Sequence, residues 1–356
     1  MRKSQSGFSI VELMVAALIG LIGSVVIFQV FAVFESQKRT TTGGGDAQSS
    51  VALAMHAIER DARQAGFGIN DPNFLGCTVS AWDEIGSSAF TVPFLPVLIT
   101  QGVAASDSDS LTFLYGSSQL AHFPPKLIQG MVSPAADYRV SNRHGFELGD
   151  VLVAAELRGI PLAPVCTMSQ VRVLPTGAGS NDVIEHSNGV YVVDGKTLNT
   201  RFNSPVLGPN YAADSTRIFN LGRNPTINSY TVSNGQLVQQ SFRGTATPLW
   251  TSIPIMDGIV QIQAQYGKDK LLNDNVVDTY EDAPPTTPAE WGQVLSIRVA
   301  LAARVGQYEK DVVSPPTITM WTGGPVWTLT AEETHYRYRI IDTIVPIRNM
   351  IWKRPP

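Results

Sequence analysis

Residues 7–34 read GFSIVELMVAALIGLIGSVVIFQVFAVF, an almost uninterrupted apolar run. Every residue from Phe8 to Phe34 is apolar or small, with four polar exceptions. These are Ser9, Glu12, Ser24 and Gln29. As a helix, 27 residues extend about 40 Å, which exceeds a hydrocarbon core of roughly 30 Å. The stretch therefore predicts a membrane-spanning helix over residues 8–34.

Charges on either side of the apolar run indicate its orientation. Arg2 and Lys3 precede it and favour a cytoplasmic N-terminus, although Lys38 and Arg39 beyond it weaken the asymmetry. A secretory signal would have a shorter apolar core followed by a small-residue cleavage site, and neither is present. A plain signal anchor is the simplest alternative.

Glu12 argues against a plain anchor. A charged side chain in an apolar span costs roughly 2.5–3.5 kcal/mol at the membrane centre by insertion scales, and less near the interface. Such a group usually marks a function and requires a partner of opposite charge.

The string from Gly7 to Leu13 resembles the class III signal of type IV pilins and type II secretion pseudopilins. That pattern is a basic leader ending in Gly, then Phe, then Glu at the fifth mature position, then an apolar helix. The resemblance implies that a prepilin peptidase removes residues 1–7 by cutting between Gly7 and Phe8, and that Phe8 is N-methylated. It also implies that Glu12 faces the N-terminal cation of a neighbouring subunit within a helical bundle.

Residues 35–45 are polar and include Gly43, Gly44 and Gly45. Each glycine disfavours helix by about 1 kcal/mol relative to Ala. The triplet predicts either a kink or a flexible linker, and Asp46 is then the expected N-cap of a returning helix.

An apolar stripe follows at helical spacing and predicts a helix that packs on a sheet. Its members are Val51, Met55, Ile58, Ala62 and Ala65. Glu59 and Arg63 form an expected i,i+4 ion pair, and glycines 66 and 68 end the element. Residues 35–68 are thus expected to continue the helix in the periplasm. The string from Ile58 to Phe67, with its Glu-Arg-Asp core, resembles the end of the long helix in PilW-type minor pilins.

The helical period disappears after about residue 69, and short β-type runs alternate with turn signals. The expected strands are 111–115, 150–155, 190–193, 230–232, 237–240, 259–266, 294–305 and 337–347. Asn234-Gly235 predicts a hairpin turn, and the Pro-rich residues 283–288 predict a loop. No repeat or second domain boundary is evident. The predicted fold is α+β and type IV pilin-like, with a long N-terminal helix on a largely antiparallel β body at 69–356 with long loops.

Three later stretches also resemble PilW-type proteins, namely residues 257–267, 293–305 and 345–349. They favour that family over its closest rival, a minor pseudopilin of type II secretion. Residues 85–250 carry almost no assigned resemblance.

The only two cysteines, Cys77 and Cys166, lie on the periplasmic side of the predicted span. That compartment is oxidising, which favours a disulfide over two buried free thiols. Such a bridge would close a loop of nearly 90 residues and contribute at most about 4–5 kcal/mol by chain-entropy arguments.

The acidic loop at 269–278 is a candidate calcium site. Asp274, Asn275 and Asp278 offer oxygen ligands, but the usual glycine is missing and two leucines interrupt the acids. A solvated loop is the favoured interpretation, and neither a metal nor a cofactor is expected.

Composition and motifs do not indicate an enzyme. The sequence lacks a G-x-S-x-G elbow, a Walker loop and an H-E-x-x-H pair, and its five histidines are scattered. The net charge of −4 gives no basic footprint for nucleic acid. The Tyr-Arg alternation at 336–339 could stack bases or sugars, but a strand is its commoner cause.

The family resemblance implies a non-enzymatic minor pilin that primes type IV pilus assembly and sits at or near the pilus tip. Twitching motility, adhesion or DNA uptake would depend on it. A tip-located adhesin or DNA receptor is the other alternative. Expected partners are other minor pilins, the major pilin, the prepilin peptidase, the inner-membrane assembly platform and, at the tip, an adhesin. The expected location is a single-pass inner-membrane protein with a periplasmic body, which later joins the surface fibre.

Overall fold

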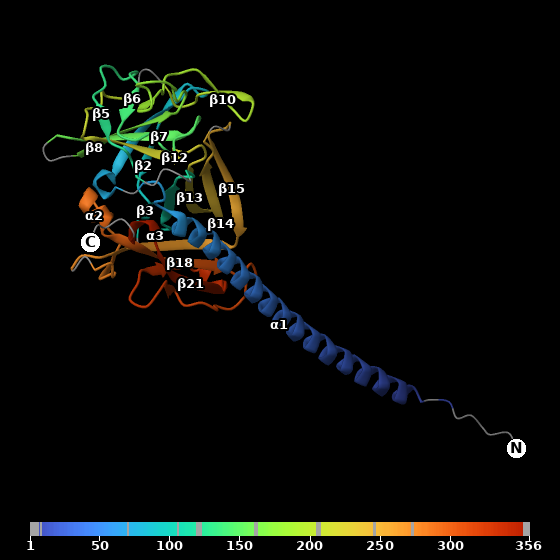
Figure 1. Ribbon diagram of the computed structural model, residues 1–356. Coiled ribbons are helices and arrows are strands. Elements are labelled where there is room, and N and C mark those ends of the chain that lie inside the picture. The colour runs from blue at the N-terminus through green and yellow to red at the C-terminus, as the bar shows by residue number, and fades with distance from the viewer. Residues whose placement is uncertain are drawn as a thin grey trace.

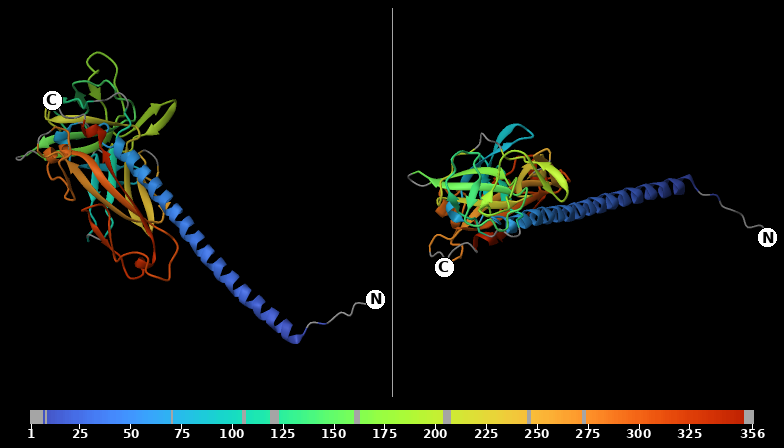
Figure 2. Two further views of the ribbon diagram at one scale, coloured as in Figure 1. Left: turned by 90° about the horizontal axis from the view of Figure 1, so that it is seen from below. Right: turned by 45° about the horizontal axis from the view of Figure 1, so that its top comes forward.

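One long helix and a β-rich body make up the protein. The computed structural model describes residues 7, 9–69, 71–104, 107–118, 123–159, 163–203, 208–244, 247–271 and 274–351. Helix α1 (Ile10–Gln64) projects from the body with its N-terminal half and lies against the body with its C-terminal half (Figures 1 and 2). The expected α+β class, with a helix on a largely antiparallel body, is confirmed.

Three large sheets form the body. The first has the order β12 (Thr216–Gly222), β7 (Val151–Arg158), β8 (Ala163–Gln170), β1 (Cys77–Asp83), β2 (Ser88–Phe94). The second has the order β15 (Trp250–Asp257), β14 (Gln236–Phe242), β13 (Thr226–Ser233), β4 (Ser110–Tyr115), β3 (Val97–Thr100). The third has the order β17 (Thr279–Glu281), β16 (Ile259–Lys268), β18 (Val294–Arg304), β21 (Tyr338–Pro346). Within these three sheets the only parallel pair among the described residues is β1 with β8.

Smaller elements complete the fold. The short strands are β10 (Val190–Val193) with β11 (Lys196–Asn199), β19 (Thr317–Thr319) with β20 (Val326–Thr328), and β5 (Leu127–Gln129), β6 (Tyr138–Val140) and β9 (Val183–Ile184). The short helices are η1 (Pro72–Phe74), α2 (Pro288–Gly292), η2 (Glu333–His335) and α3 (Arg348–Ile351).

The prediction of a break in the long helix is wrong. Residues 35–45 are helical throughout, so the glycine triplet is neither a kink nor a linker, and Asp46 lies inside α1 rather than at an N-cap. The reason is tertiary packing, because a Cβ on Gly43 would come within 2.7 Å of Val305 Cγ1. The missing side chain lets the end of β18 approach the helix, and this packing outweighs the low helix propensity of glycine.

The predicted apolar stripe is buried against the sheets. Val51, Met55, Ile58, Ala62 and Ala65 are all at most 3% exposed. They join the main core, in which α1 packs across β18 and β21 of the third sheet (Figure 1). The expected ion pair also forms, since Arg63 Nη2 lies 2.8 Å from Glu59 Oε2.

The helix ends close to where glycine predicts it. Gln64 is its last residue, and Gly66 and Gly68 both adopt a φ of +82°, which favours glycine. Gly66 N–H donates to Leu114 O at 2.9 Å, which ties the turn to β4.

Every strand predicted from the sequence is present; the bounds of 190–193 are confirmed and the others differ at one end or both. The Asn234-Gly235 turn joins β13 to β14, and both residues have positive φ (52° and 71°), as a two-residue hairpin requires. The sequence analysis does not predict the remaining strands, which include β1, β2, β8 and β12 of the first sheet. They fall largely in residues 85–250, where β-type runs are short and mixed with polar residues.

Candidate assembly site

The start of α1 brings the predicted processing and assembly residues close together. The Ser9 hydroxyl accepts from Val11 N–H at 3.3 Å, and the Glu12 carboxylate accepts from Ser9 N–H at 3.0 Å. These reciprocal bonds form a capping box that satisfies two backbone donors at the helix start. Gly7 is exposed just before it, whereas Phe8 lies outside the described residues.

The first half of α1 presents an unbroken apolar surface. All its large apolar side chains from Ile10 to Phe34 are exposed, by 47% to 80%. Among the described residues, α1 is the only helix long and apolar enough to cross a membrane. An isolated soluble protein rarely exposes so much apolar surface, so this segment requires lipid or other apolar helices around it.

A buried carboxylate fixes the second half of α1 on the body. Asp61 is fully buried, and its Oδ2 accepts from Tyr230 OH and Asn228 Nδ2, each at 2.6 Å. Its Oδ1 accepts from Tyr115 OH at 3.2 Å, and the partly exposed Arg60 adds an ion pair at 3.4 Å. Burial and the nearby carboxylate raise the pKa of Tyr115 to about 12, and that of Tyr230 further, so both hydroxyls stay protonated and can donate. The network locks α1 to β4 and β13.

The predicted disulfide between Cys77 and Cys166 is present. It joins β1 to β8, the two parallel neighbours of the first sheet, across 89 residues of chain. No free thiol therefore remains, since these are the only cysteines.

The acidic loop holds its carboxylates against its own backbone. Asp278 Oδ2 accepts from the N–H groups of Lys270 and Leu271 at 2.7 and 2.8 Å, and Asp274 Oδ1 accepts from Val276 N–H at 3.0 Å. Asn275 adopts a φ of 65°, the turn conformation that glycine would otherwise supply. Asp274, Asn275 and Asp278 are all exposed, and the described residues contain no group of three His, Cys, Asp or Glu side chains able to hold a metal.

The Tyr-Arg alternation at 336–339 is used internally. Arg337 pairs with Glu309 at 2.6 Å, Arg304 stacks over the Tyr336 ring at 4.5 Å, and Tyr338 packs edge-on against Trp327. These contacts explain the pattern by packing alone.

Sequence reasoning missed the role of Asp61. It lies three residues after Ile58, on the buried face of the helix, and a carboxylate at such a position was the signal that a donor network must surround it. The donors come from residues 115, 228 and 230, and no local pattern relates these to position 61.

Comparison with known families fits this geometry. Residues 2–28 match the prokaryotic N-terminal methylation motif. No curated protein and no solved structure matches the chain. The motif, together with an apolar helix that continues into a β body, is typical of a membrane-anchored pilin-like subunit. Residues 224–349 match the type IV pilus-assembly protein W family. The two matches together support a PilW-type pilin, a structural pilus component, and they imply interaction with other pilus components and with the prepilin peptidase.

Proposed function

We propose that this pilin is a minor subunit that primes type IV pilus assembly and lies at or near the tip of the fibre. The observation that supports it best is the exposed apolar half of α1 with one carboxylate, Glu12, in its first turn. Such a helix leaves lipid only when other apolar helices replace the lipid around it. A complex of minor pilins, followed by the major pilin, supplies those helices.

Glu12 is the proposed assembly contact. In the single subunit its carboxylate caps Ser9 N–H, which directly follows the amino terminus that cleavage after Gly7 would create. In the bundle, the methylated amino group of Phe8 on a neighbouring subunit pairs with Glu12 and offsets the cost of burying the acid. Losing the cap costs only about 0.5–2 kcal/mol, which an ion pair in low dielectric can exceed.

The test is complementation of a deletion strain with Glu12→Ala, and with Glu59→Ala as the matched control, a carboxylate of the same helix outside the apolar run. We expect Glu12→Ala to reduce surface pili at least about tenfold, because each order of magnitude requires only 1.4 kcal/mol. Glu59→Ala should leave pili near wild-type numbers. Sheared pili are counted by electron microscopy and immunoblotting.

Two further readouts complete the test. N-terminal sequencing of the mature protein should begin at methylated Phe8, and a start at Met1 would overturn the proposal.

Loss of exoprotein secretion with normal pili in the deletion strain would point instead to a type II secretion pseudopilin. Binding of DNA or glycans by the fragment beginning near residue 35 would favour a tip receptor.

A further inference from the structure

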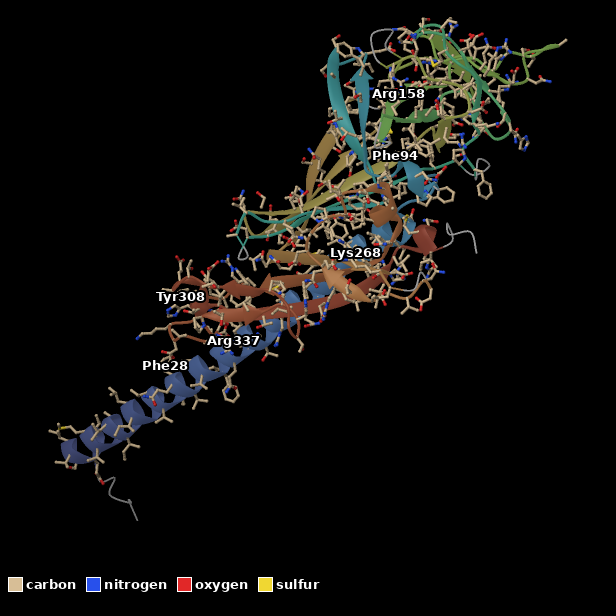
Figure 3. The ribbon with its side chains drawn as sticks, turned by 90° about the vertical axis from the view of Figure 1, so that its left-hand side faces the viewer. Phe28, Phe94, Arg158, Lys268, Tyr308 and Arg337 are labelled. Atoms are coloured by element: carbon tan, nitrogen blue, oxygen red, sulfur yellow. A yellow bond between two sulfur atoms is a disulfide. The ribbon has the colours of Figure 1, made fainter. Side chains whose placement is uncertain are left out.

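A polar groove of about 600 Å³ lies where α1 leaves the body. On the helix side its lining includes Glu35, Lys38 and Arg39, and on the body side Arg304 and Gln307. Figure 3 shows Tyr308 and Arg337 at this end of the body, on the side from which the segment bearing Phe28 emerges. The groove is therefore at the end of the body that faces the membrane.

The distance of the groove from the end of the apolar run matches the thickness of the headgroup layer of a bilayer. The apolar run ends at Phe34, and Lys38 lies four residues further along the helix, or about 6 Å. The headgroup region occupies roughly 5–8 Å on each side of the hydrocarbon core. Tyr308, which is 51% exposed, adds an amphipathic ring of the kind enriched at this depth.

Two cations in the groove are not neutralised by carboxylates. Arg39 is paired with Glu35 at 3.0 Å, but no carboxylate in the described part of the chain pairs with Lys38 or Arg304. The Arg304 guanidinium is held over the Tyr336 ring at 4.5 Å, so its position is fixed before any ligand arrives.

Besides Glu35, two further acids line the same groove and bear on which ligand fits. Asp46 lies eight residues beyond Lys38 on α1, about 12 Å further from the membrane. Asp257 Oδ1 accepts from the Gln236 side chain at 2.6 Å. This bond leaves the charge of Asp257 in place, so three acids and three cations line the groove, and Glu35, Lys38 and Arg39 lie nearest the apolar run.

Two apolar hollows lie next to the groove, on the part of α1 that is N-terminal to it. Glu35 and Lys38 also line a second hollow formed by Phe28, Phe31 and Phe34. Phe31 and Phe34 in turn line a third, wholly apolar hollow beside Val26 and Val30. A polar end with Lys38 and Arg304, next to shallow apolar hollows on the surface of the helix, complements the headgroup and the acyl chain of an amphiphile.

From this geometry we infer that the groove binds one phospholipid of the outer leaflet of the inner membrane. Lys38 and Arg304 bind its phosphodiester, and an acyl chain lies along Phe28, Phe31 and Phe34. The site would hold the body against the membrane surface before the subunit is extracted. The inference needs only the membrane anchor, so it can fail while the proposed role in pilus assembly stands.

The first test is native mass spectrometry of the full-length protein released from nanodiscs of phosphatidylethanolamine and phosphatidylglycerol. We expect wild-type protein to retain one phospholipid, and Lys38→Gln to reduce the lipid-bound fraction at least fivefold. Lys310→Gln is the matched control, because it removes the same charge from an exposed residue outside the groove. Arg304→Lys should retain the lipid, which distinguishes loss of charge from disturbed packing around Tyr336.

A photo-crosslinking amino acid at Gln307 gives an independent readout in cells. A phospholipid adduct on the monomeric protein supports the site. Crosslinks only to another pilin would show that a neighbouring helix fills the groove and would overturn the inference. Equal lipid retention by Lys38→Gln and Lys310→Gln would also overturn it.

Discussion

At the residue scale, the chain uses two carboxylates of α1 in opposite ways. Glu12 lies in the exposed apolar half, where its hydrogen bond within the described residues is a backbone cap that a neighbour can displace. Asp61 lies in the buried half, where two tyrosines and an asparagine already surround it. The first is suited to intersubunit contact, and the second holds the subunit itself together.

Asp61→Ala should therefore destabilise the body strongly. The change leaves buried donors of Tyr230 and Asn228 without an acceptor, and hydrogen bonds to charged groups contribute about 1.5–3 kcal/mol each. We expect a loss of about 3 kcal/mol or more in the free energy of unfolding, measured by urea denaturation of the fragment beginning at residue 35. Arg60→Ala is the control, because Arg60 is mostly exposed and should cost under about 1 kcal/mol. Equal losses in both variants would show that Asp61 is not a special anchor.

His186 makes stability depend on pH. Its ring stacks on Tyr138 at 3.9 Å, Nε2 contacts Ala136 O at 2.9 Å, and burial lowers its pKa to about 4. The unfolded chain binds a proton below about pH 6.5, whereas the folded chain does so only near pH 4. Stability is thus lost as pH falls through this window, by up to about 3 kcal/mol.

The corresponding variant is His186→Phe, which keeps an aromatic ring against Tyr138 but cannot titrate. Urea denaturation between pH 4.5 and 7.5 should show a smaller loss at low pH than in the wild type. Identical pH profiles for the two proteins would mean that other groups cause the dependence.

At the element scale, the glycine triplet of α1 divides into positions with different surroundings. Gly43 faces Val305 at the end of β18, whereas a Cβ on Gly45 would meet nothing within 4 Å. One glycine therefore sets the distance between helix and sheet, and the other has no packing role.

Gly43→Ala and Gly45→Ala form a matched pair that tests this difference. Gly45→Ala should stabilise the protein by up to about 1 kcal/mol through helix propensity. Gly43→Ala gains the same propensity but must displace Val305, and overpacking of this kind costs about 1–3 kcal/mol. Thermal unfolding of the residue-35 fragment measures both. A stabilised Gly43→Ala would show that the close approach is not needed.

At the scale of the whole molecule, the helix divides into a half that the body needs and a half that it does not. Residues 10–34 expose their large apolar side chains, whereas the stripe beginning at Val51 is buried in the main core. The disulfide lies in the first sheet, away from the anchor.

Removal of residues 1–34 should thus give a folded and soluble body. We expect its free energy of unfolding to lie within about 0.5 kcal/mol of the full chain in detergent, as for changes at exposed sites. Size-exclusion chromatography should show a monomer, because the apolar surface is gone. A further truncation to residue 56 is the control, and it should unfold the body because it removes Val51 and Met55. A body that needs residues 10–34 for folding would contradict the division.

The long apolar helix, the place of Glu12 near its start, the disulfide and the buried apolar stripe can all be predicted from the sequence alone. Each depends on residues that are close in the chain or, for the cysteines, on there being only two. Hydrophobic length, helical period and turn chemistry act locally, so they can be read without the fold.

The tertiary structure was needed to show that Gly43 stays helical, that Asp61 is an anchor, and that strands of two sheets, the second and the third, pack against α1. These outcomes depend on partners such as Val305 and Tyr230, which lie well over 150 residues away in the chain. Packing energies of a few kcal/mol exceed local propensities of about 1 kcal/mol, so distant contacts override what the local sequence favours.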